Sequence, residues 1–493
     1  MTASNTVPQL SAASLPELAP DIDAPCYDRT KVQVGIVHFG VGGFHRAHQA
    51  TYLHRLMQRG QALDYGICGV GLLAGDARMR DVLHSQDGLY TVIEQAADGT
   101  RTARVVGSIV RYLFAPDDPA AVLDALTDPA VRIVSMTVTE GGYCRDPHGD
   151  FDPDHPDVRA DLAGTDAPHT PFGLVVDALA RRRAQGTAAF TVLSCDNVPN
   201  NGRIARDTVC GFAALRDNDL ADWIRESVSF PASMVDRITP ATADSDLDEV
   251  ADRLGARDEW PVLCESFTQW VVEDEFPTGR PPLQDVGVQL VDDSEPYETL
   301  KLRLLNGGHQ ALGYLGALAG HRYVDDAAGD PQLSSFFTAY TDEVIPTLPA
   351  VEGIDVPAYR DELLERFGNP AVRDTLERIC SYSSDRIPTF VLPALRDNLA
   401  AGRDVRAAAL LLAAWARYCE GAADDGTPLE LVDPRADQLR ETADRRTKDP
   451  LAFLRDRSLF GDLVDDARFT DHYATALDLL VTRGATATCG DYT

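Results

Sequence analysis

The sequence predicts a two-domain α/β protein, in which an N-terminal domain built on a parallel sheet precedes a mostly α-helical C-terminal domain. Three observations predict this. A strand, a glycine-rich turn and a helix follow one another near the N-terminus, apolar strand segments recur up to residue 272, and helical spacing of apolar residues dominates from residue 298 onward. The 493 residues also exceed what one hydrophobic core normally accommodates. We place an N-terminal arm at 1–29 and the two domains at 30–295 and 296–493.

The first strand, Lys31 to Phe39, leads directly into a glycine turn and a helix. Glycines let the backbone turn tightly and approach a pyrophosphate, which then lies at the helix N-terminus. The match to G-x-G-x-x-G is incomplete, because His45 stands where the third glycine is expected. In this context the motif predicts a Rossmann-type dinucleotide-binding domain. The predicted cofactor-binding residues of the turn are Phe39, Gly40, Val41, Gly42, Gly43, Phe44 and His45.

The second strand, Tyr65 to Leu72, is followed by a candidate for cofactor selectivity, Asp76. An acid just past this strand accepts the adenosine ribose hydroxyls and disfavours a 2′-phosphate. Gly75 precedes it, so the local negative charge is modest. NAD is therefore the predicted cofactor, and use of NADP stays open. The structural alternative for Asp76 is the N-cap of the next helix, and one residue can serve both roles.

The later strands end in polar, glycine-rich stretches at 139–143 and 194–202. Ligands bind at the carboxyl ends of strands in open α/β sheets. Asn197 is predicted to donate a hydrogen bond to a substrate oxygen, with simple turn chemistry as the alternative. Asp236, in an apolar context, is a further candidate. The segment 147–171 predicts a surface loop. The strands concerned are predicted at 89–94, 104–109, 131–138, 188–193 and 262–272, the last at an elaborated edge of the same sheet.

The segment Glu298 to Leu315 is the most unusual of the predicted helices. At about 100° per residue, a carboxylate, a lysine, an amide and an imidazole fall within about 140° of one another. These four side chains are Glu298, Lys301, Asn306 and His309. Gly307 and Gly308 lie mid-helix, where each costs roughly 1 kcal/mol against Ala, so we expect another element to approach there. The alternative is the solvated edge of a core helix.

The remaining C-terminal helices carry a second candidate site. Arg378 and Arg386 flank a polar loop, and two arginines there are suited to binding hydroxyls or a carboxylate. The alternative is salt bridging to the abundant aspartates of this chain. The helices are predicted at 299–320, 332–345, 356–368, 370–381, 389–401, 404–420, 433–443, 448–458 and 466–482.

A dinucleotide domain followed by a helical domain indicates hydride transfer, which needs a base for the hydroxyl proton. Cys and His ligands for a zinc ion do not cluster in the sequence, and a Tyr-x-x-x-Lys arrangement is missing. Lys301 remains, one of only three lysines in the chain. Burial lowers the pKa of a lysine until it can serve as a base. Asn197 and Asn306 are then placed to stabilise the developing alkoxide, and Glu298 to carry the proton to solvent.

Composition limits the other partners. The net charge of −32 argues against nucleic acid and anionic membranes. It indicates either adaptation to high salt or a codon bias toward Asp and Arg. The nine cysteines show no C-x-x-C pair, which favours reduced thiols over disulfides or a zinc site. No apolar run approaches the length of a membrane span, and the N-terminal residues lack the basic-then-apolar pattern of a signal peptide, so a cytoplasmic protein is expected.

Five motifs occur in order along the chain and together point to a known family. They are GVGGFHRAHQA (40–50), TVTEGGY (137–143), SCDNVPNNG (194–202), MVDRITP (234–240) and KLRLLNGGH (301–309). From about residue 30 to 480, the chain resembles the polyol-specific long-chain dehydrogenase/reductase family, also called the mannitol dehydrogenase family.

The resemblance implies a metal-independent, NAD-dependent polyol dehydrogenase that interconverts D-mannitol and D-fructose at C2. It implies that Lys301 is the general base and that Glu298 gates proton flow. Asn197 and Asn306 would polarise the reacting oxygen. The substrate-binding residues implied are His309, Asp236, Arg378 and Arg386, although a lysine is common at the last position. Many members carry Glu-Asp where this chain has Gly75-Asp76, which leaves strict NAD preference open.

Other functions stay open at this point. Relatives in the family act on D-arabinitol, D-sorbitol, fructuronate or tagaturonate, and a sugar acid would need an arginine for its carboxylate. The alternative from another class is a cofactor-binding sensor without catalysis. A small polyol or ketose is the expected partner, and a monomer is expected rather than a stable oligomer.

Overall fold

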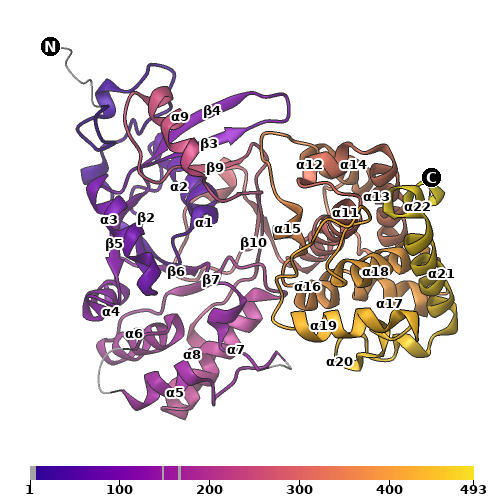
Figure 1. The fold of residues 1–493 in the computed structure, drawn as a ribbon. Coiled ribbons are helices and arrows are strands. Elements are labelled where there is room, and N and C mark those ends of the chain that lie inside the picture. Colours follow the sequence, from indigo (N-terminus) through magenta and orange to yellow (C-terminus); the bar gives the residue numbers. More distant parts are fainter. Residues whose placement is uncertain (1–6, 147–148, 165–167, 493) are drawn as a thin grey trace. The chain divides into compact units, whose positions relative to one another are not determined.

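Five parallel strands form the first sheet of the protein, in the order β5-β2-β1-β6-β7 (Figure 1). The computed structural model describes residues 7–146, 149–164 and 168–492. The chain leaves β1 toward β2 on one side and reaches β6 on the other, so the strand order reverses at β1. This is the switch point at which Rossmann-type sheets bind ligands. The strands are β1 (Val34–Phe39), β2 (Gly66–Gly71), β5 (Ile109–Phe114), β6 (Ile133–Met136) and β7 (Thr191–Ser194).

Helices cover both faces of this sheet, so its strands are apolar on both sides. Along β1, Val37 and Phe39 belong to the core on one face and Ile36 to the core on the other. The two groups of helices lie on opposite sides of the strands in Figure 1. One face carries α1 (Gly43–Ala47), α2 (Gln49–Gln58) and α3 (Ala77–Ser85), and the other α4 (Pro119–Thr127), α6 (Pro171–Gln185), α7 (Asn201–Ala214) and α8 (Asn218–Ser227).

The strands outside the first sheet form two further three-stranded sheets. One has the order β4-β3-β9 and the other β11-β10-β8. The elements are β3 (Tyr90–Gln95), β4 (Arg101–Val106), β8 (Ser233–Asp236), β9 (Val262–Glu265), β10 (Gln269–Glu273) and β11 (Gln289–Val291), with α9 (Asp244–Leu254) before β9.

Three details of the sequence prediction are wrong here. The predicted strand 262–272 is two strands, β9 and β10, in different sheets. The predicted strand 104–109 combines the end of β4 with the start of β5, which Gly107 and Ser108 separate. The segment 147–171, expected to be a loop, contains helix α5 (Pro156–Ala163), which begins at a proline in its favoured first-turn position. The predicted loop also includes residues outside the described ranges.

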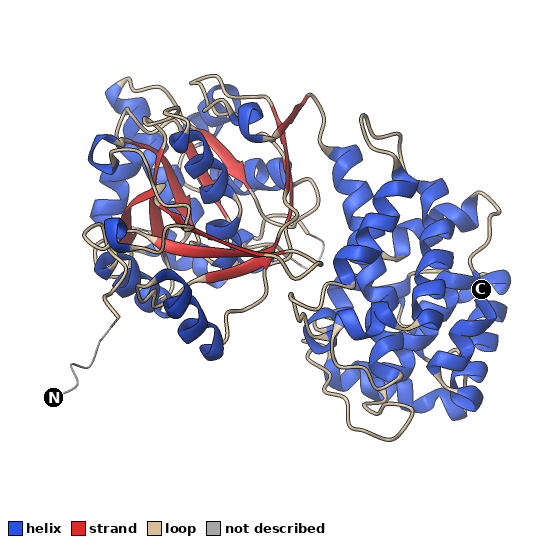
Figure 2. Ribbon diagram, turned by 90° about the horizontal axis from the view of Figure 1, so that it is seen from above, coloured by secondary structure: helices blue, strands red, loops and turns tan. Residues whose placement is uncertain are grey.

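The C-terminal unit is built from helices, as Figure 2 shows. The chain folds into two compact units, an N-terminal one (Met1–Ala96 and Thr100–Glu295) and a C-terminal one (Ala97–Gly99 and Pro296–Thr493). Helix α18 (Arg406–Cys419) is apolar around nearly its whole circumference and packs against α11 (Gly307–Leu318) and α21 (Ala467–Arg483). Within the described residues, no helix is both long and apolar enough to cross a bilayer.

The other helices of this unit agree with the predicted positions in most cases. The segment 448–458, predicted as one helix, contains only short turns before α20. The remaining bounds are α10 (Glu295–Leu300), α12 (Val324–Gly329), α13 (Pro331–Val344), α14 (Val356–Phe367), α15 (Leu376–Cys380), α16 (Ser383–Phe390), α17 (Leu392–Ala400), α19 (Ala436–Ala443), α20 (Arg457–Phe460) and α22 (Ala485–Cys489).

Candidate active site

The turn after β1 requires glycine at its first position. Gly40 has a φ of +85°, and a Cβ there would lie 2.1 Å from the carbonyl oxygen of Thr137. The Thr137 hydroxyl in turn donates to the carbonyl oxygen of Gly40 over 2.7 Å. This close approach joins the carboxyl ends of β1 and β6 at the switch point.

The space above the next two glycines is open. A Cβ at Gly42 would meet nothing within 4 Å, and one at Gly43 would meet only a methyl group of Thr239 at 3.7 Å. Gly42 is also the N-cap of α1, whose first backbone N–H groups have no intrahelical partner. The turn therefore has the free N–H groups and the room that a pyrophosphate needs, and it fits a dinucleotide.

The bulky residues predicted to bind the cofactor point largely into the core. Phe39, Val41 and His45 are all buried, so only their backbone is available to a ligand. The His45 ring stacks on His38 with a centroid distance of 3.4 Å, which explains why an imidazole occupies the third glycine position. Burial lowers the pKa of His38 to about 3 and that of His45 well below its usual value, so both are neutral at working pH. Phe44 is half-buried and stacks on His48.

Asp76 lies just after β2 and fixes the turn there. Its Oδ2 atom accepts hydrogen bonds from the backbone N–H groups of Leu72 (2.8 Å) and Leu73 (2.9 Å). Asp76 is the N-cap residue of α3, as the alternative interpretation had it, but its side chain makes no capping hydrogen bond to that helix. A Cβ at Gly75 would meet nothing within 4 Å. The side chain of Asp76 therefore lies just past the second strand, where the acid of Rossmann-type domains is expected, and its binding to an adenosine ribose stays a prediction.

A buried hydrogen-bond network joins the ends of β6 and β7. The Asp196 carboxylate accepts from the backbone N–H of Thr139 (2.8 Å) and from the hydroxyl of Tyr143 (2.7 Å). Tyr143 also lies 2.5 Å from the Ser194 hydroxyl. Both polar stretches were predicted from the sequence, but Asp196 and Tyr143 were not, because spacing alone does not show which polar side chain points into the protein.

The two substrate candidates of the N-terminal unit differ in exposure. Asn197 directly follows this network and is exposed, whereas Asp236 ends β8 and is 4% exposed. Asn201, which was not predicted, bonds the backbone on both sides: its Nδ2 donates to the carbonyls of Asp196 (3.0 Å) and Ser233 (2.7 Å). Asn201 thus joins the segment after β7, next to Asn197, to the first residue of β8, the strand that ends at Asp236.

In the C-terminal unit, the segment with the lysine is helical but not uniformly α-helical. A π-helical turn, η6 (Lys301–Asn306), separates α10 from α11. In a π-turn hydrogen bonds join residues five apart, so Lys301 and Asn306 lie one turn apart on one face of the helix. Regular α-helical geometry would place them about 140° apart. The angles predicted for a regular α-helix are therefore wrong across this turn. The π-turn brings Lys301 and Asn306 closer together than predicted.

The four helix candidates differ in burial. Lys301 is 5% and His309 7% exposed, whereas Glu298 and Asn306 are half-buried. The Oδ1 atom of Asn306 is itself buried and has no hydrogen-bond partner among the described residues. The His309 ring stacks on Phe367 with a centroid distance of 4.0 Å.

Gly307 and Gly308, which are unfavourable within a helix, have the close neighbours that the sequence predicted. A Cβ at Gly307 would lie 2.7 Å from the Tyr340 hydroxyl, and one at Gly308 would lie 2.6 Å from the Phe337 ring. Both aromatic residues belong to α13. The glycines therefore let α13 pack directly against the backbone at the end of the π-turn.

The two arginines around the predicted polar loop are already engaged. The Arg378 guanidinium forms a two-point ion pair with Asp374, with Nε donating to Oδ1 over 2.6 Å. The Nη1 of Arg386 donates to the carbonyls of Arg378 (2.9 Å) and Ile379 (2.7 Å). The alternative interpretation as salt bridging to aspartate describes Arg378, whereas Arg386 holds the end of α15.

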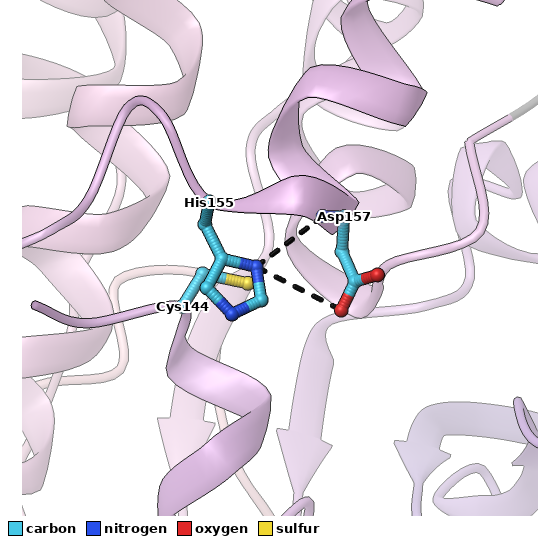
Figure 3. A group of neighbouring side chains, drawn as sticks. All are labelled: Cys144, His155 and Asp157. Atoms are coloured by element: carbon cyan, nitrogen blue, oxygen red, sulfur yellow. Dashed lines mark hydrogen bonds and ion pairs between the residues drawn. The ribbon is translucent and has the colours of Figure 1, made fainter.

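The cysteines are all free, and one of them has metal-ligand neighbours. Cys144 lies beside His155 and Asp157, a grouping that the sequence did not predict (Figure 3). The prediction that no Cys and His ligands cluster is therefore wrong at this position, because a turn of the chain returns His155 to Cys144.

Two family profiles match the chain, one for each unit. The mannitol dehydrogenase Rossmann domain matches residues 34–285, and the mannitol dehydrogenase C-terminal domain matches residues 293–481. A mannitol 2-dehydrogenase of Phaeosphaeria nodorum is 45% identical over 490 residues, which cover 98% of this chain and 85% of that relative.

Two solved structures share the fold over nearly the full length. The mannitol 2-dehydrogenase of Pseudomonas fluorescens, in a ternary complex with NAD and D-mannitol, has a TM-score of 0.90 at 43% identity and covers 98% of this chain and 99% of its own. A D-sorbitol dehydrogenase in substrate-free form has a TM-score of 0.90 at 38% identity and covers 98% and 100%.

Proposed function

Because this chain belongs to the mannitol dehydrogenase family, we propose that it interconverts D-mannitol and D-fructose by oxidation at C2 with NAD. The chain is an oxidoreductase of this family, and both the curated relative and the first solved structure are mannitol 2-dehydrogenases. Because the second solved structure is a D-sorbitol dehydrogenase, D-sorbitol is the alternative substrate that we consider.

The glycine turn supports NAD as the cofactor. The open backbone at Gly42 and Gly43 would hold the pyrophosphate, and Asp76 would accept from the ribose hydroxyls. When bound, the nicotinamide of NAD accepts the hydride that leaves C2 of the polyol. Since Gly75 adds no second charge, we expect a preference for NAD rather than exclusion of NADP.

We propose that Lys301 is the general base. Taking the hydroxyl proton as hydride leaves requires an amine that is neutral before the reaction. The 5% exposure of Lys301 disfavours the charged ammonium form. Glu298 lies in α10, three residues before Lys301, and is more exposed, so we assign it the transfer of the proton to solvent. Because Lys301 takes this proton, the mechanism needs no metal ion.

The observation that carries the mechanism is the π-turn between Lys301 and Asn306. It aligns a base with an amide whose oxygen is buried, and π-turns within α-helices are frequent at functional sites. We propose that the amide N–H groups of Asn306 stabilise the developing alkoxide, as preorganised dipoles do in an oxyanion hole. His309, one helical turn further along, would bind a neighbouring hydroxyl.

For the N-terminal unit, we propose substrate-binding roles for Asn197 and Asp236. The exposed amide of Asn197 would donate a hydrogen bond to a substrate oxygen. The buried carboxylate of Asp236 would accept from a substrate hydroxyl. The network around Asp196 and Asn201 would hold both residues in place.

The arginines favour a neutral polyol over a sugar acid. A uronate would need a free guanidinium for its carboxylate. The guanidinium group of Arg378 binds Asp374, and that of Arg386 binds two main-chain carbonyls. A bound uronate would therefore have to displace an existing partner. We propose that both residues position the substrate site of the C-terminal unit and that Arg386 contacts substrate hydroxyls.

Initial rates with a panel of substrates test the proposal. NADH oxidation is measured with D-fructose, D-xylulose and D-fructuronate, and NAD reduction with D-mannitol, D-sorbitol and D-arabinitol. We expect kcat/KM to be highest for the mannitol–fructose pair. Turnover restricted to fructuronate would refute the neutral-polyol assignment. NADH binding without turnover of any substrate would support the sensor alternative. A monomer in gel filtration is also expected, and the cytoplasmic location stays a prediction.

A further inference from the structure

Three side chains of different ligand types converge beside η4 (Glu140–Tyr143), on the N-terminal unit. The sulfur of Cys144, a ring nitrogen of His155 and a carboxylate oxygen of Asp157 all lie within 4.8 Å of one another (Figure 3). The Nδ1 of His155 is 3.8 Å from the Oδ2 of Asp157. In the part of the chain that the structure describes, this is the one group of three or more such residues close enough to share an ion.

Backbone hydrogen bonds bring these residues together. The N–H of Asp152 donates to the carbonyl of Cys144 over 2.9 Å, and a bridge pairs Arg145 with Phe151. The ring of Phe151 packs against the helix backbone at Gly211, where a Cβ would lie 2.5 Å from it. The hairpin is thus anchored to α7, and the chain returns beside Cys144 when α5 begins.

The surroundings of the sulfur are acidic. Cys144 is 3% exposed, and burial, with the carboxylates of Asp157, Asp161 and Asp152 nearby, raises the pKa of its thiol to about 11. These negative charges disfavour a bare thiolate and favour a cation at the same position. No arginine or lysine is an ion-pair partner of Asp157 among the described residues.

The spacing suits a small tetrahedral ion after a slight contraction. With Zn–S of about 2.3 Å and Zn–N or Zn–O of about 2.1 Å, tetrahedral ligand atoms lie about 3.4–3.6 Å apart. One ligand atom from each of the three residues lies within 4.8 Å of the others, so each pair needs to contract by about 1.4 Å at most. Asp157 is exposed, so its side chain is free to adjust, and the fourth position is left to water.

We propose that Cys144, His155 and Asp157 bind one thiophilic divalent cation of the zinc class. On binding, the thiol loses its proton to solvent and the sulfur bonds to the ion, with no change of oxidation state. This site has no part in hydride transfer. It lies one residue from Tyr143, whose hydroxyl bonds Ser194 and Asp196, so a bound ion holds the hairpin against the carboxyl ends of β6 and β7.

Cobalt binding to the full-length, chelator-treated protein tests this proposal. We expect one equivalent of Co²⁺ to produce a thiolate-to-metal charge-transfer band that Zn²⁺ displaces. Cys144→Ser, which keeps the size of the side chain, abolishes the band. Cys26→Ser is the matched control, because Cys26 is the exposed cysteine at which adventitious binding is expected, and this variant retains the band.

A second variant separates ligation from folding. The Nδ1 of His155 accepts from the backbone N–H of Asp157 over 3.3 Å and so caps α5. Asparagine is also a favoured N-cap, so His155→Asn keeps the cap and removes the imidazole ligand. We expect its thermal midpoint to stay unchanged without metal and its Co²⁺ affinity to fall at least tenfold. No band in the wild type, or a band that persists in Cys144→Ser, would overturn the proposal.

Discussion

Single residues in this protein decide between chemical alternatives that the sequence leaves open. Asp76 is a case: its position after β2 was predicted, but its two backbone hydrogen bonds were not. Arg378 is the opposite case, since the sequence offered both a substrate contact and an ion pair, and the structure contains the ion pair with Asp374. Long-range partners of this kind depend on the folded chain, so motif spacing cannot identify them.

Cofactor selectivity is predicted to depend on Gly75. Its φ is not positive and a Cβ there has open space, so Gly75→Glu introduces a second carboxylate beside Asp76 without a clash. Repulsion of a 2′-phosphate at about 4 Å is worth ~1–4 kcal/mol, so the ratio of kcat/KM for NAD over NADP should rise about tenfold. Gly75→Gln is the neutral control of equal size. Equal ratios for the two variants would show that charge at this position does not set selectivity.

Stability is predicted to depend on the protonation of Glu343. Its carboxylate accepts from the N–H groups of Ala407 (2.9 Å) and Ala408 (3.1 Å), and burial raises its pKa to about 7. The folded state therefore holds the proton more tightly than the unfolded state, and the free energy of unfolding falls as pH rises from about 4.5 to 7. The full effect is on the order of 3 kcal/mol.

Urea unfolding of Glu343→Gln and the wild type across this pH range measures the effect. The variant cannot ionise here, so its stability relative to the wild type should increase with pH and level off above 7. The exposed Glu362→Gln serves as the control and should show no such trend. A difference between Glu343→Gln and the wild type that does not vary with pH would contradict the assignment.

At the scale of elements, the helix at 298–315 shows which features of a helix the spacing of apolar residues can predict. The apolar pattern predicted the helix, and the two glycines predicted the close approach that α13 makes. The π-turn was not predictable, because one extra residue in a turn leaves composition and apolar spacing almost unchanged. The split of the predicted strand 262–272 was missed for a similar reason: β9 and β10 read as one apolar run.

Removing one residue from η6 tests the importance of the π-turn. Deletion of Arg303 should restore α-helical hydrogen bonding, so that Lys301 and Asn306 stay on one face, four residues apart, but shift on a narrower turn of helix. Turnover should fall by about 10²-fold or more, as misplacement of about 1 Å can cause, while helix content by circular dichroism is kept. Arg303→Ala loses only the bonds to Thr347 and Asp397 and should keep most activity. Comparable activity in the deletion variant would show that the π-turn is dispensable.

At the scale of the whole molecule, composition and motifs predicted the architecture because the local sequence patterns of each unit agree with the elements that it forms. Parallel strands with helices on both faces follow from β1, its glycine turn and the repeated apolar runs. The grouping of Cys144 with His155 and Asp157 lay beyond such reasoning, since it depends on a hairpin within a stretch that looked like a loop. Local signals gave the elements, whereas pairs of residues brought together by tertiary folding required the structure.

The net charge of −32 predicts salt-dependent stability. Repulsion among exposed carboxylates opposes the compact state, and the screening length falls from about 30 Å at 0.01 M to about 3 Å at 1 M salt. The thermal midpoint should rise by at least about 3 °C between these KCl concentrations. NaCl should act equally if screening is the cause. A midpoint indifferent to both salts would also remove the argument for adaptation to high salt.

The measurement that most directly tests the mechanism is the kcat of Lys301→Ala for D-mannitol oxidation, with NADH binding followed in parallel. General-base catalysis predicts a loss of about 10²–10⁴-fold with NADH affinity retained, and partial recovery when a small primary amine is added. Lys448→Ala, at an exposed lysine, should behave as the wild type. Near-normal turnover in Lys301→Ala would contradict the assignment of the base and with it the role proposed for the π-turn.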